Sequence, residues 1–183
     1  MSRSFQITNI FHRLSVFENL RCAVLWSLGY RYSFWHKLNE LKDARYQAEQ
    51  VMESIGLAWR RDTAAGLLTY AEQRALEIGI TIAGGAEVIL LDEPTAGMSR
   101  SESDAAVNLI SRVTEGKTLL MVEHDMSLVS KVSDRVLAMN QGEVLAIGAP
   151  AEVQSHPDVV EAYLGGGLES VQLERASTEH AQR

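Results

Sequence analysis

The sequence predicts an α/β fold, with a parallel sheet covered by helices on both faces. Three short apolar runs are typical of strands, at residues 87–91, 118–122 and 135–139, and helical patterns at 102–113 and 126–132 separate them. Strands that alternate with helices favour parallel pairing, because each helix carries the chain back to the end of the sheet from which the next strand starts. The predicted α/β part spans residues 85–164.

A helical part is expected before the sheet, over about residues 10–83. Apolar residues recur there at helical spacing on two stripes. The first stripe is Val16, Leu20, Val24 and Leu28, and the second is Ala44, Ala48, Val51, Met52 and Ile55. A further helix is expected from near Thr69 to Ala83, where Gly84 and Gly85 end it.

The third strand runs into "MNQGEVLAIG", residues 139–148. Two strands joined by Gln-Gly predict a β-hairpin, which we expect at the edge of the sheet. Short helices at residues 150–154 and 158–164 are expected to close the domain. The stretch 165–183 begins with three glycines and has little periodicity, so we expect a flexible tail.

Composition excludes several classes of protein. The chain has 183 residues, of which 46% are hydrophobic and 22% charged, which is enough to bury the core of one ordinary domain. A net charge of -7 without a basic cluster argues against a nucleic-acid partner. Cys22 is the only cysteine, so neither an internal disulfide nor a zinc site is expected. With no long apolar stretch and no signal peptide, the sequence predicts a cytoplasmic location.

Two adjacent carboxylates follow the first strand, in "VILLDEPTAG" at residues 88–97. Asp92 and Glu93 would lie beyond the carboxyl end of a buried strand, where open α/β sheets bind ligands. Asp92 suits Mg²⁺, which takes few protein carboxylates, and Glu93 could orient or deprotonate a water that attacks a phosphate. Solvated loop acids are the alternative, and the pair alone leaves both interpretations open.

His124 and Asp125 end "LLMVEHD" and would lie at the same edge of the sheet as Asp92 if the two strands are neighbours. Beside Glu93, His124 could reach a terminal phosphate and sense it. A lone histidine in such a position is otherwise a satisfied loop residue. Gln6 could donate to a water or a metal ligand, but a single glutamine carries almost no weight alone.

Residues 68–79, "LTYAEQRALEIG", have the start signal of a helix. Thr69 and Glu72 have the spacing of a capping box, in which each side chain accepts a hydrogen bond from the other's backbone amide. A helix N-terminus also presents amide donors and a partial positive charge that suit phosphate. The stretch therefore supports a structural role and a binding role together.

Taken in order, these motifs resemble the nucleotide-binding subunit of ATP-binding cassette (ABC) transporters. Gln6, "LTYAEQ", "VILLDEP", "TAGMS" and "VEHD" follow one another at the family's spacing, over residues 3–164. "RSFQ", "FENL", "EQRALEIG" and "VVEAYLG" look most like the ATP-binding subunits of branched-chain amino-acid importers. The resemblance implies a P-loop NTPase-like sheet flanked by helices, with a helical subdomain that carries the family signature.

The resemblance also implies roles for single residues. Glu93 corresponds to the catalytic glutamate, His124 to the switch histidine, and Asp92 to the Walker B aspartate that contacts ATP through Mg²⁺. Gln6 corresponds to the loop glutamine that contacts nucleotide and metal. The implied contacts with ATP in the signature and in the loop that faces the partner subunit are Leu68, Thr69, Tyr70, Ala71, Glu72, Gln73 and Ser99.

Two kinds of partner are implied in the same way. A second ABC ATPase subunit, identical or different, would face the signature, and transmembrane permease subunits would hold the chain at the cytoplasmic face of the inner membrane. The signature departs from the family at Ala71, where glycine is common. Because an alanine at positive φ costs on the order of 1 kcal/mol and adds a methyl group, we expect a weaker contact with phosphate.

A larger departure is that the sequence contains no G-x-x-x-x-G-K-[ST] segment. The nearest candidate ends in Gly116, Lys117 and Thr118, but Ser111 occupies the first glycine position and the triplet runs into a strand. The domain is therefore expected to be incomplete at its N-terminus. We expect residues 1–183 alone to bind ATP very weakly, not to hydrolyse it, and to expose an apolar sheet edge.

Two alternatives remain open from the sequence. The chain could be a non-catalytic ABC subunit that contributes only its signature surface to a complete partner. It could also be an ABC-type ATPase of DNA repair or translation. The repair and translation relatives carry long coiled-coil insertions or a duplicated domain, and this chain has neither.

Overall fold

A computed structural model describes the protein over residues 2–3, 10–30 and 41–162. The chain forms two compact units, Met1–His124 and Asp125–Arg183. Gln6 and the expected tail at 165–183 lie outside the described residues, as does the end of the helix expected at 158–164. The expected boundary between a helical part and an α/β part near Gly84 stays a prediction.

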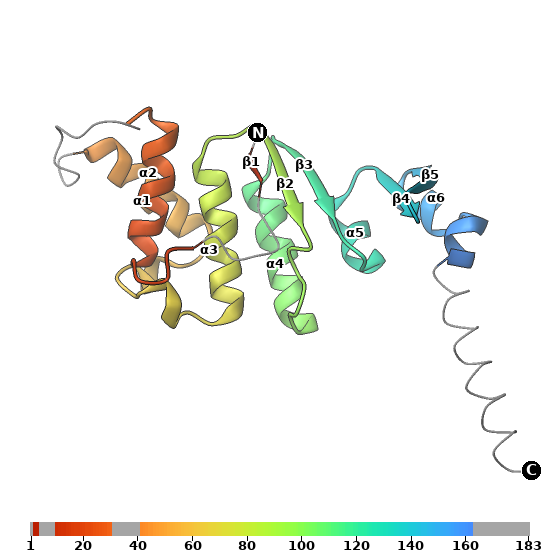
Figure 1. Ribbon diagram of the computed structural model, residues 1–183, viewed down its shortest axis with the longest axis horizontal. Helices are drawn as coiled ribbons and strands as arrows, with labels where there is room; N and C mark the ends of the chain where they lie inside the picture. The colour runs from red at the N-terminus through yellow and green to blue at the C-terminus, as the bar shows by residue number, and fades with distance from the viewer. Residues whose placement is uncertain (1, 4–9, 31–40, 163–183) are drawn as a thin grey trace, which may run out of the picture. The chain divides into compact units, whose positions relative to one another are not determined.

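The first unit contains a group of three packed helices, which Figure 1 shows side by side. They are α1 (Val16–Ser27), α2 (Lys42–Ser54) and α3 (Tyr70–Ala83), and two short 3-10 helices, η2 (Ala58–Arg60) and η3 (Ala65–Leu67), lie between α2 and α3. The predicted start and end of α3 are confirmed. Gly84 is its C-cap residue, and Gly85 follows with a φ of 67°, a conformation that favours glycine.

The two predicted apolar stripes form the core of this unit. Val16, Leu20 and Val24 on α1 are fully buried, as are Ala44 and Ala48 on α2. Each stripe meets α3, whose Leu76 is also fully buried. Helical periodicity therefore identified the packed face of each helix, because residues three and four apart share one side of an α-helix.

The first unit also contains a three-stranded parallel sheet, in the order β1 (Ser2–Arg3), β2 (Val88–Asp92) and β3 (Thr118–Val122). Helix α4 (Arg100–Val113) connects β2 to β3. Ile89 and Leu91 of the central strand, which share one face of the sheet, are buried, and Val88 and Leu90 on the other face are half-buried. The register places Asp92 opposite Val122, so β2 and β3 end together at the same edge of the sheet.

The second unit contains α5 (Met126–Val132), the strands β4 (Val136–Asn140) and β5 (Glu143–Gly148), and α6 (Pro150–Gln154). The chain is again helical over 157–162. Val153 and Val159 are the most buried residues of its small core. The predicted Gln-Gly turn is confirmed: Gln141 and Gly142 have φ values of 50° and 87°, the left-handed conformations that a tight hairpin requires.

The expectation that the strand at 135–139 joins the parallel sheet is wrong for the described residues. There β4 pairs only with β5, antiparallel, in a two-stranded sheet of its own. The two-residue turn returns the chain directly beside the strand it has just left, so the predicted pairing of β4 with β5 is confirmed. The expected place of this hairpin at the edge of the parallel sheet is not confirmed.

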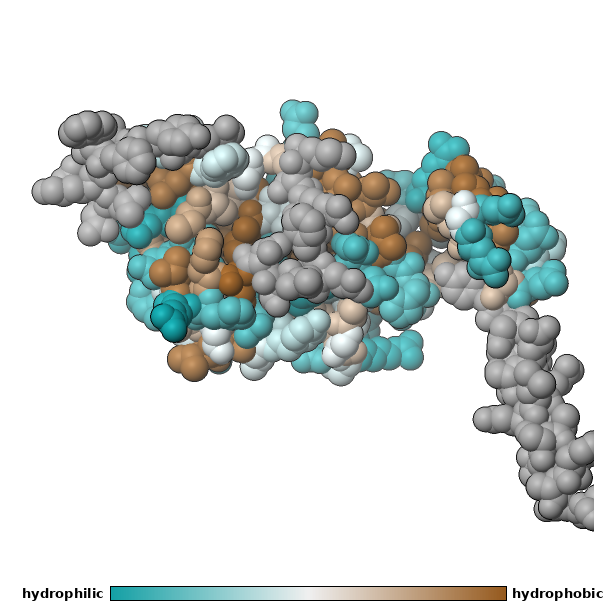
Figure 2. All heavy atoms as spheres, viewed as in Figure 1, coloured by the Kyte–Doolittle hydropathy of each residue, from teal (hydrophilic) through white to brown (hydrophobic). Residues whose placement is uncertain are grey.

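Apolar side chains lie at the surface of both units, as Figure 2 shows in brown. Leu120 and Val122 of β3 are each 58% exposed, and β3 is an edge strand in the described sheet. The expected exposure of an apolar sheet edge is therefore confirmed at β3. In the described part of the chain, no helix is both long enough and apolar enough to cross a bilayer.

The burial of α3 gives a test of the fold. Leu76 is fully buried, whereas Leu67 is 76% exposed. We expect Leu76→Ala to lower the free energy of unfolding by about 2–5 kcal/mol, because it removes buried apolar volume and leaves a cavity. The matched control, Leu67→Ala, should change it by less than about 0.5 kcal/mol. Urea denaturation followed by tryptophan fluorescence measures both, and equal effects would contradict this packing.

Candidate functional site

The ends of β2 and β3 bring together the acidic pair and the histidine that the sequence singled out. The amide of Glu93 donates to the carbonyl of Val122 at 2.9 Å and extends the strand pairing by one residue. His124 follows two residues after Val122, and its Nδ1 lies 3.8 Å from Oε1 of Glu93. The expected neighbourhood of His124 and Glu93 is confirmed. Their functional roles stay predictions.

Both side chains of this pair are accessible to a ligand. The side chain of His124 is 74% exposed and that of Glu93 is 33% exposed. The backbone of Glu93 has a φ of 43°, an uncommon conformation for a residue with a side chain. Such backbone strain persists where the surrounding structure holds it, and it is frequent at functional sites. The turn after β2 is therefore a specialised feature of this unit.

Glu123 is a buried carboxylate that the motif analysis did not single out. Its side chain is 1% exposed. Its Oε1 accepts hydrogen bonds from the amide and the hydroxyl of Thr95, at 3.1 and 2.6 Å. Its Oε2 has no hydrogen-bond partner in the described part of the chain and lies 3.9 Å from Nδ1 of His124. A charged residue directly after an apolar strand was the available sequence signal.

The signature stretch forms the start of α3, as predicted. The hydroxyl of Thr69 accepts from the amide of Glu72, and the carboxylate of Glu72 accepts from the amide of Thr69 at 2.7 Å. Gln73 donates its side-chain amide to the carbonyl of Leu68 at 3.1 Å, which adds a further bond across the helix start. The predicted capping box is confirmed. Contact between these residues and ATP stays a prediction.

The expected strain at Ala71 is wrong. Ala71 lies in the first turn of α3, and among the described residues only Glu93 and Gln141 combine a side chain with positive φ. Because alanine favours the helical conformation, the residue costs no backbone strain here. Tyr70, its neighbour, donates its hydroxyl to the carbonyl of Ala96 at 2.9 Å and so joins the signature to the loop after β2.

Ser99 has a capping role of its own at the start of α4. Its hydroxyl accepts from the amide of Glu102, and its amide donates to the carboxylate of Glu102 at 2.9 Å. Helices α3 and α4 therefore both begin with a capping box. A capped helix start still presents its dipole to an anion.

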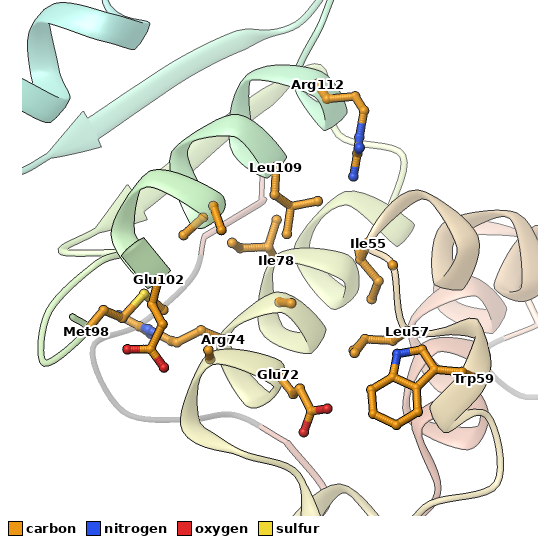
Figure 3. A pocket seen from close by; sticks show the side chains of 15 residues that line it. Ile55, Leu57, Trp59, Glu72, Arg74, Ile78, Met98, Glu102, Leu109 and Arg112 are labelled. Atoms are coloured by element: carbon orange, nitrogen blue, oxygen red, sulfur yellow. The ribbon is translucent and has the colours of Figure 1, made fainter. Parts of the chain in front are cut away.

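A pocket of about 320 Å³ lies in the first unit, close to these two helix starts. Its lining includes Ala71 and Glu72 from α3, and Met98 and Glu102 from the start of α4 (Figure 3). Neither Glu93 nor His124 lines it. The predicted site residues thus fall into three places: Asp92, Glu93 and His124 at the strand ends, residues 68–73 at the start of α3, and Ser99 at the start of α4. Tyr70 supplies a hydrogen bond from the signature to the loop that follows Glu93.

A magnesium site would need ligands from outside this part of the chain. No group of three His, Cys, Asp or Glu side chains in the described residues is arranged to hold a metal ion. Asp92 supplies a hard oxygen ligand at the end of β2, which is the donor type that Mg²⁺ takes. The residues fit an ion that is held by one or two carboxylates, with substrate phosphates and water as its remaining ligands.

Comparison with known proteins identifies the family. Residues 1–96 match the family described as ABC transporter. The chain belongs to this family. Residues 143–169 match a second family, described as branched-chain amino acid ATP-binding cassette transporter. ABC ATPases bind nucleotide and hydrolyse ATP, so this ABC protein is an ATPase by family, with a fold that agrees with the parallel sheet and flanking helices observed here.

Curated relatives match most of this ABC chain. The "High-affinity branched-chain amino acid transport ATP-binding protein LivG" of Salmonella typhimurium is 37% identical over 171 residues, which cover 89% of this chain and 67% of LivG. The protein BraF of Pseudomonas aeruginosa, with the same description, is 33% identical over 171 residues, with the same coverage. A solved structure of MJ1267, "an ATP-binding cassette of an ABC transporter", superposes with a TM-score of 0.72 at 27% identity and covers 88% of this chain and 67% of MJ1267.

The ion pair at the signature gives a pH-dependent prediction. Burial raises the pKa of Glu72, but hydrogen bonds from Thr69 and from Arg60, which lies 3.1 Å away, outweigh it and hold the pKa below its ordinary value of 4.5. Because the folded pKa is the lower one, charged Glu72 stabilises the fold above pH 4.5, and this contribution is lost as the pH falls through the folded pKa.

We therefore expect Glu72→Gln to lower the free energy of unfolding by about 1 kcal/mol at neutral pH, and by nothing measurable below the folded pKa. Glutamine keeps the capping geometry, so the substitution isolates the charge. The exposed Glu115, changed to Gln, is the matched control and should show no such pH dependence. Urea denaturation across the acidic range measures the difference, and a constant difference would contradict the prediction.

Proposed function

We propose that this chain acts as the ATP-hydrolysing subunit of an ABC importer for branched-chain amino acids. The proposal rests on one observation above the others, the approach of His124 to Glu93 at the joined ends of β2 and β3. The descriptions of LivG and BraF as branched-chain amino acid transport proteins support the substrate class.

In the proposed reaction, Glu93 orients a water and accepts its proton as the water attacks the terminal phosphate of ATP. The bond between the terminal phosphorus and the oxygen of ADP breaks, and ADP and phosphate leave. His124, beside Glu93, contacts the terminal phosphate and holds the attacked group in line. Asp92 would hold Mg²⁺, which neutralises phosphate charge when bound. Gln6 would contact the nucleotide and the metal.

The signature surface is proposed to act on ATP held by a second ABC ATPase subunit. Residues Leu68 to Gln73 would present the start of α3 to the phosphates, and Ser99 would lie at the contact between the two subunits. The dipole of an amide-rich helix N-terminus supports this assignment, because it favours a negatively charged partner. Permease subunits would hold the pair at the cytoplasmic face of the inner membrane, and nucleic acid has no part in this function.

A second candidate function is a non-catalytic subunit that contributes only its signature surface to a complete partner. One observation supports it: the capped start of α3, which would face a partner's ATP, is intact. The P-loop supplies the backbone amides and the lysine that wrap the phosphates of ATP. Without them, the 183-residue polypeptide would hold its own ATP weakly but could still face another subunit's ATP.

We expect the purified 183-residue chain to bind ATP with a dissociation constant well above the micromolar range, about 1 mM or weaker, because weak charge and dipole contacts are all that remain. Hydrolysis should not rise above the background. Isothermal titration and a phosphate-release assay measure these quantities, with a complete LivG-type ATPase as the positive control. Low-micromolar binding would contradict the expectation.

The genomic DNA upstream of Met1 separates the two candidates. An in-frame extension that encodes a strand followed by G-x-x-x-x-G-K-[ST] supports the ATPase. In that extended protein, Glu93→Gln should lower kcat by at least about 100-fold with little change in KM, because it removes the proton acceptor and not the binding site. Glu115→Gln is the matched control. An extended protein that binds ATP but loses no activity in the Glu93 variant would exclude the proposed role of this residue.

A further inference from the structure

Three side chains from other parts of the unit form hydrogen bonds with the loop from Glu93 to Gly97. They are Tyr70 and Arg74 of α3 and Glu123, which follows β3. The loop begins with Glu93 at a φ of 43° and ends with Gly97 at a φ of 76°. A residue with a side chain seldom keeps a positive φ unless its surroundings hold it there. The contacts that hold this loop therefore help to set the position of the Glu93 carboxylate, which is proposed to act in catalysis.

Arg74 holds the first residue of the loop. Its Nη2 donates to the carbonyl of Glu93 at 2.7 Å, and its Nη1 donates to Oε2 of Glu77, also at 2.7 Å. The side chains of Arg74 and Glu77 are 4% and 6% exposed. Charge-assisted hydrogen bonds are strong where water is excluded, so this short bond resists a change in the direction of the Glu93 carbonyl.

Tyr70 holds the far part of the same loop. It lies four residues before Arg74, and residues at this spacing share one face of a helix. Its hydroxyl donates to the carbonyl of Ala96 at 2.9 Å, and its ring lies 3.7 Å from the position that a Cβ of Gly97 would occupy. In Figure 3, Arg74 reaches from α3 toward the segment that carries Met98. One helix face thus binds both ends of the loop.

Glu123 holds the middle of the loop from the sheet. Its Oε1 accepts from both the amide and the hydroxyl of Thr95, and its side chain is buried. A carboxylate that receives two donors from one residue fixes that residue more firmly than a single bond would. The carbonyls of Glu93 and Ala96 and the amide of Thr95 are therefore hydrogen-bonded to side chains outside the loop.

We propose that Arg74, Tyr70 and Glu123 are positioning residues for Glu93. Through their hydrogen bonds they fix the loop so that the carboxylate of Glu93 faces His124. The start of α3 and the turn that carries Glu93 are therefore joined by side-chain hydrogen bonds within one subunit. This inference deepens the proposed ATPase function, and the catalytic part of it rests on that function. The hydrogen bonds from Arg74, Tyr70 and Glu123 to the loop are themselves a property of the first unit.

All three sets of hydrogen bonds lie within the 183-residue chain, so they can be tested without ATP. Amide hydrogen exchange, measured by NMR, reports the opening of the loop through Ala96 and Met98, whose amides donate to the carbonyls of Glu93 and Thr95. Tyr70→Phe removes one hydroxyl and keeps the ring. We expect exchange at these two amides to rise at least 10-fold. Tyr30→Phe is the matched control, because it removes a hydroxyl that donates to Asp43 instead.

Arg74 needs a paired substitution, because Arg74→Met alone would leave the buried Glu77 without the cation it pairs with, and the chain could unfold. The double variant Arg74→Met with Glu77→Met replaces the ion pair by apolar groups of similar volume. We expect the same rise in exchange at Ala96 and Met98, and a partial return in Arg74→Lys. Arg112→Met, which removes an arginine bond to the carbonyl of Ser54, is the matched control.

Glu123→Gln should act on the same loop, and the ring resonances of His124 provide a signature that general stability does not move. In Tyr70→Phe and in the double variant of Arg74 and Glu77 we expect these resonances to shift while exchange at the buried core of α1 and α3 stays unchanged. In Glu123→Gln, whose side chain lies 3.9 Å from Nδ1 of His124, exchange at Ala96 and Met98 is the readout and should rise as in the other two.

Unchanged loop exchange in Tyr70→Phe and in the double variant would overturn the proposal, and so would a uniform rise across the whole core. Because no nucleotide is present, failure here would leave the tests of ATP hydrolysis unaffected.

Discussion

The parallel pairing of β2 with β3 is the interaction on which the site depends. Asp92 lies opposite Val122, and one further backbone bond, from the amide of Glu93, continues the pairing beyond the strands. A shift of the register by two residues would move Glu93 and His124 apart by about 7 Å, because a strand rises about 3.3 Å per residue. Backbone hydrogen bonds, which are independent of side-chain identity, therefore set the distance between the two groups.

The signature stretch shows how one local motif serves two purposes. Thr69 and Glu72 satisfy backbone amides at the start of α3, which any helix in any protein requires. The same helix start carries the dipole that suits a phosphate. Arg60 pairs with Glu72 and stabilises its ionised form, which favours the helix start. A carboxylate at this position repels a phosphate, so the charge of Glu72 serves the stability of the helix while the dipole favours an anion.

Contacts from α3 hold the turn that carries Glu93. Tyr70 and Arg74 are part of the helix that begins with the signature, yet their hydrogen bonds end on the loop after β2. Communication between two sites requires an element whose position both sites can bias. Helix α3 lies between the two sites, because its first turn belongs to the signature and its Glu77 anchors the arginine that holds Glu93.

The sequence by itself determined the helices, the buried faces of α1 and α2, the cap of α3 and the Gln-Gly turn, because periodicity, capping and turn chemistry are local. It also placed Asp92, Glu93 and His124 at strand ends. The separation of β4 from the parallel sheet and the buried contacts of Glu123 and Arg74 were decided by tertiary structure. Each depends on residues far apart in the chain, such as Arg74 with Glu93 or Glu123 with Thr95, and no local pattern records which segments pack together.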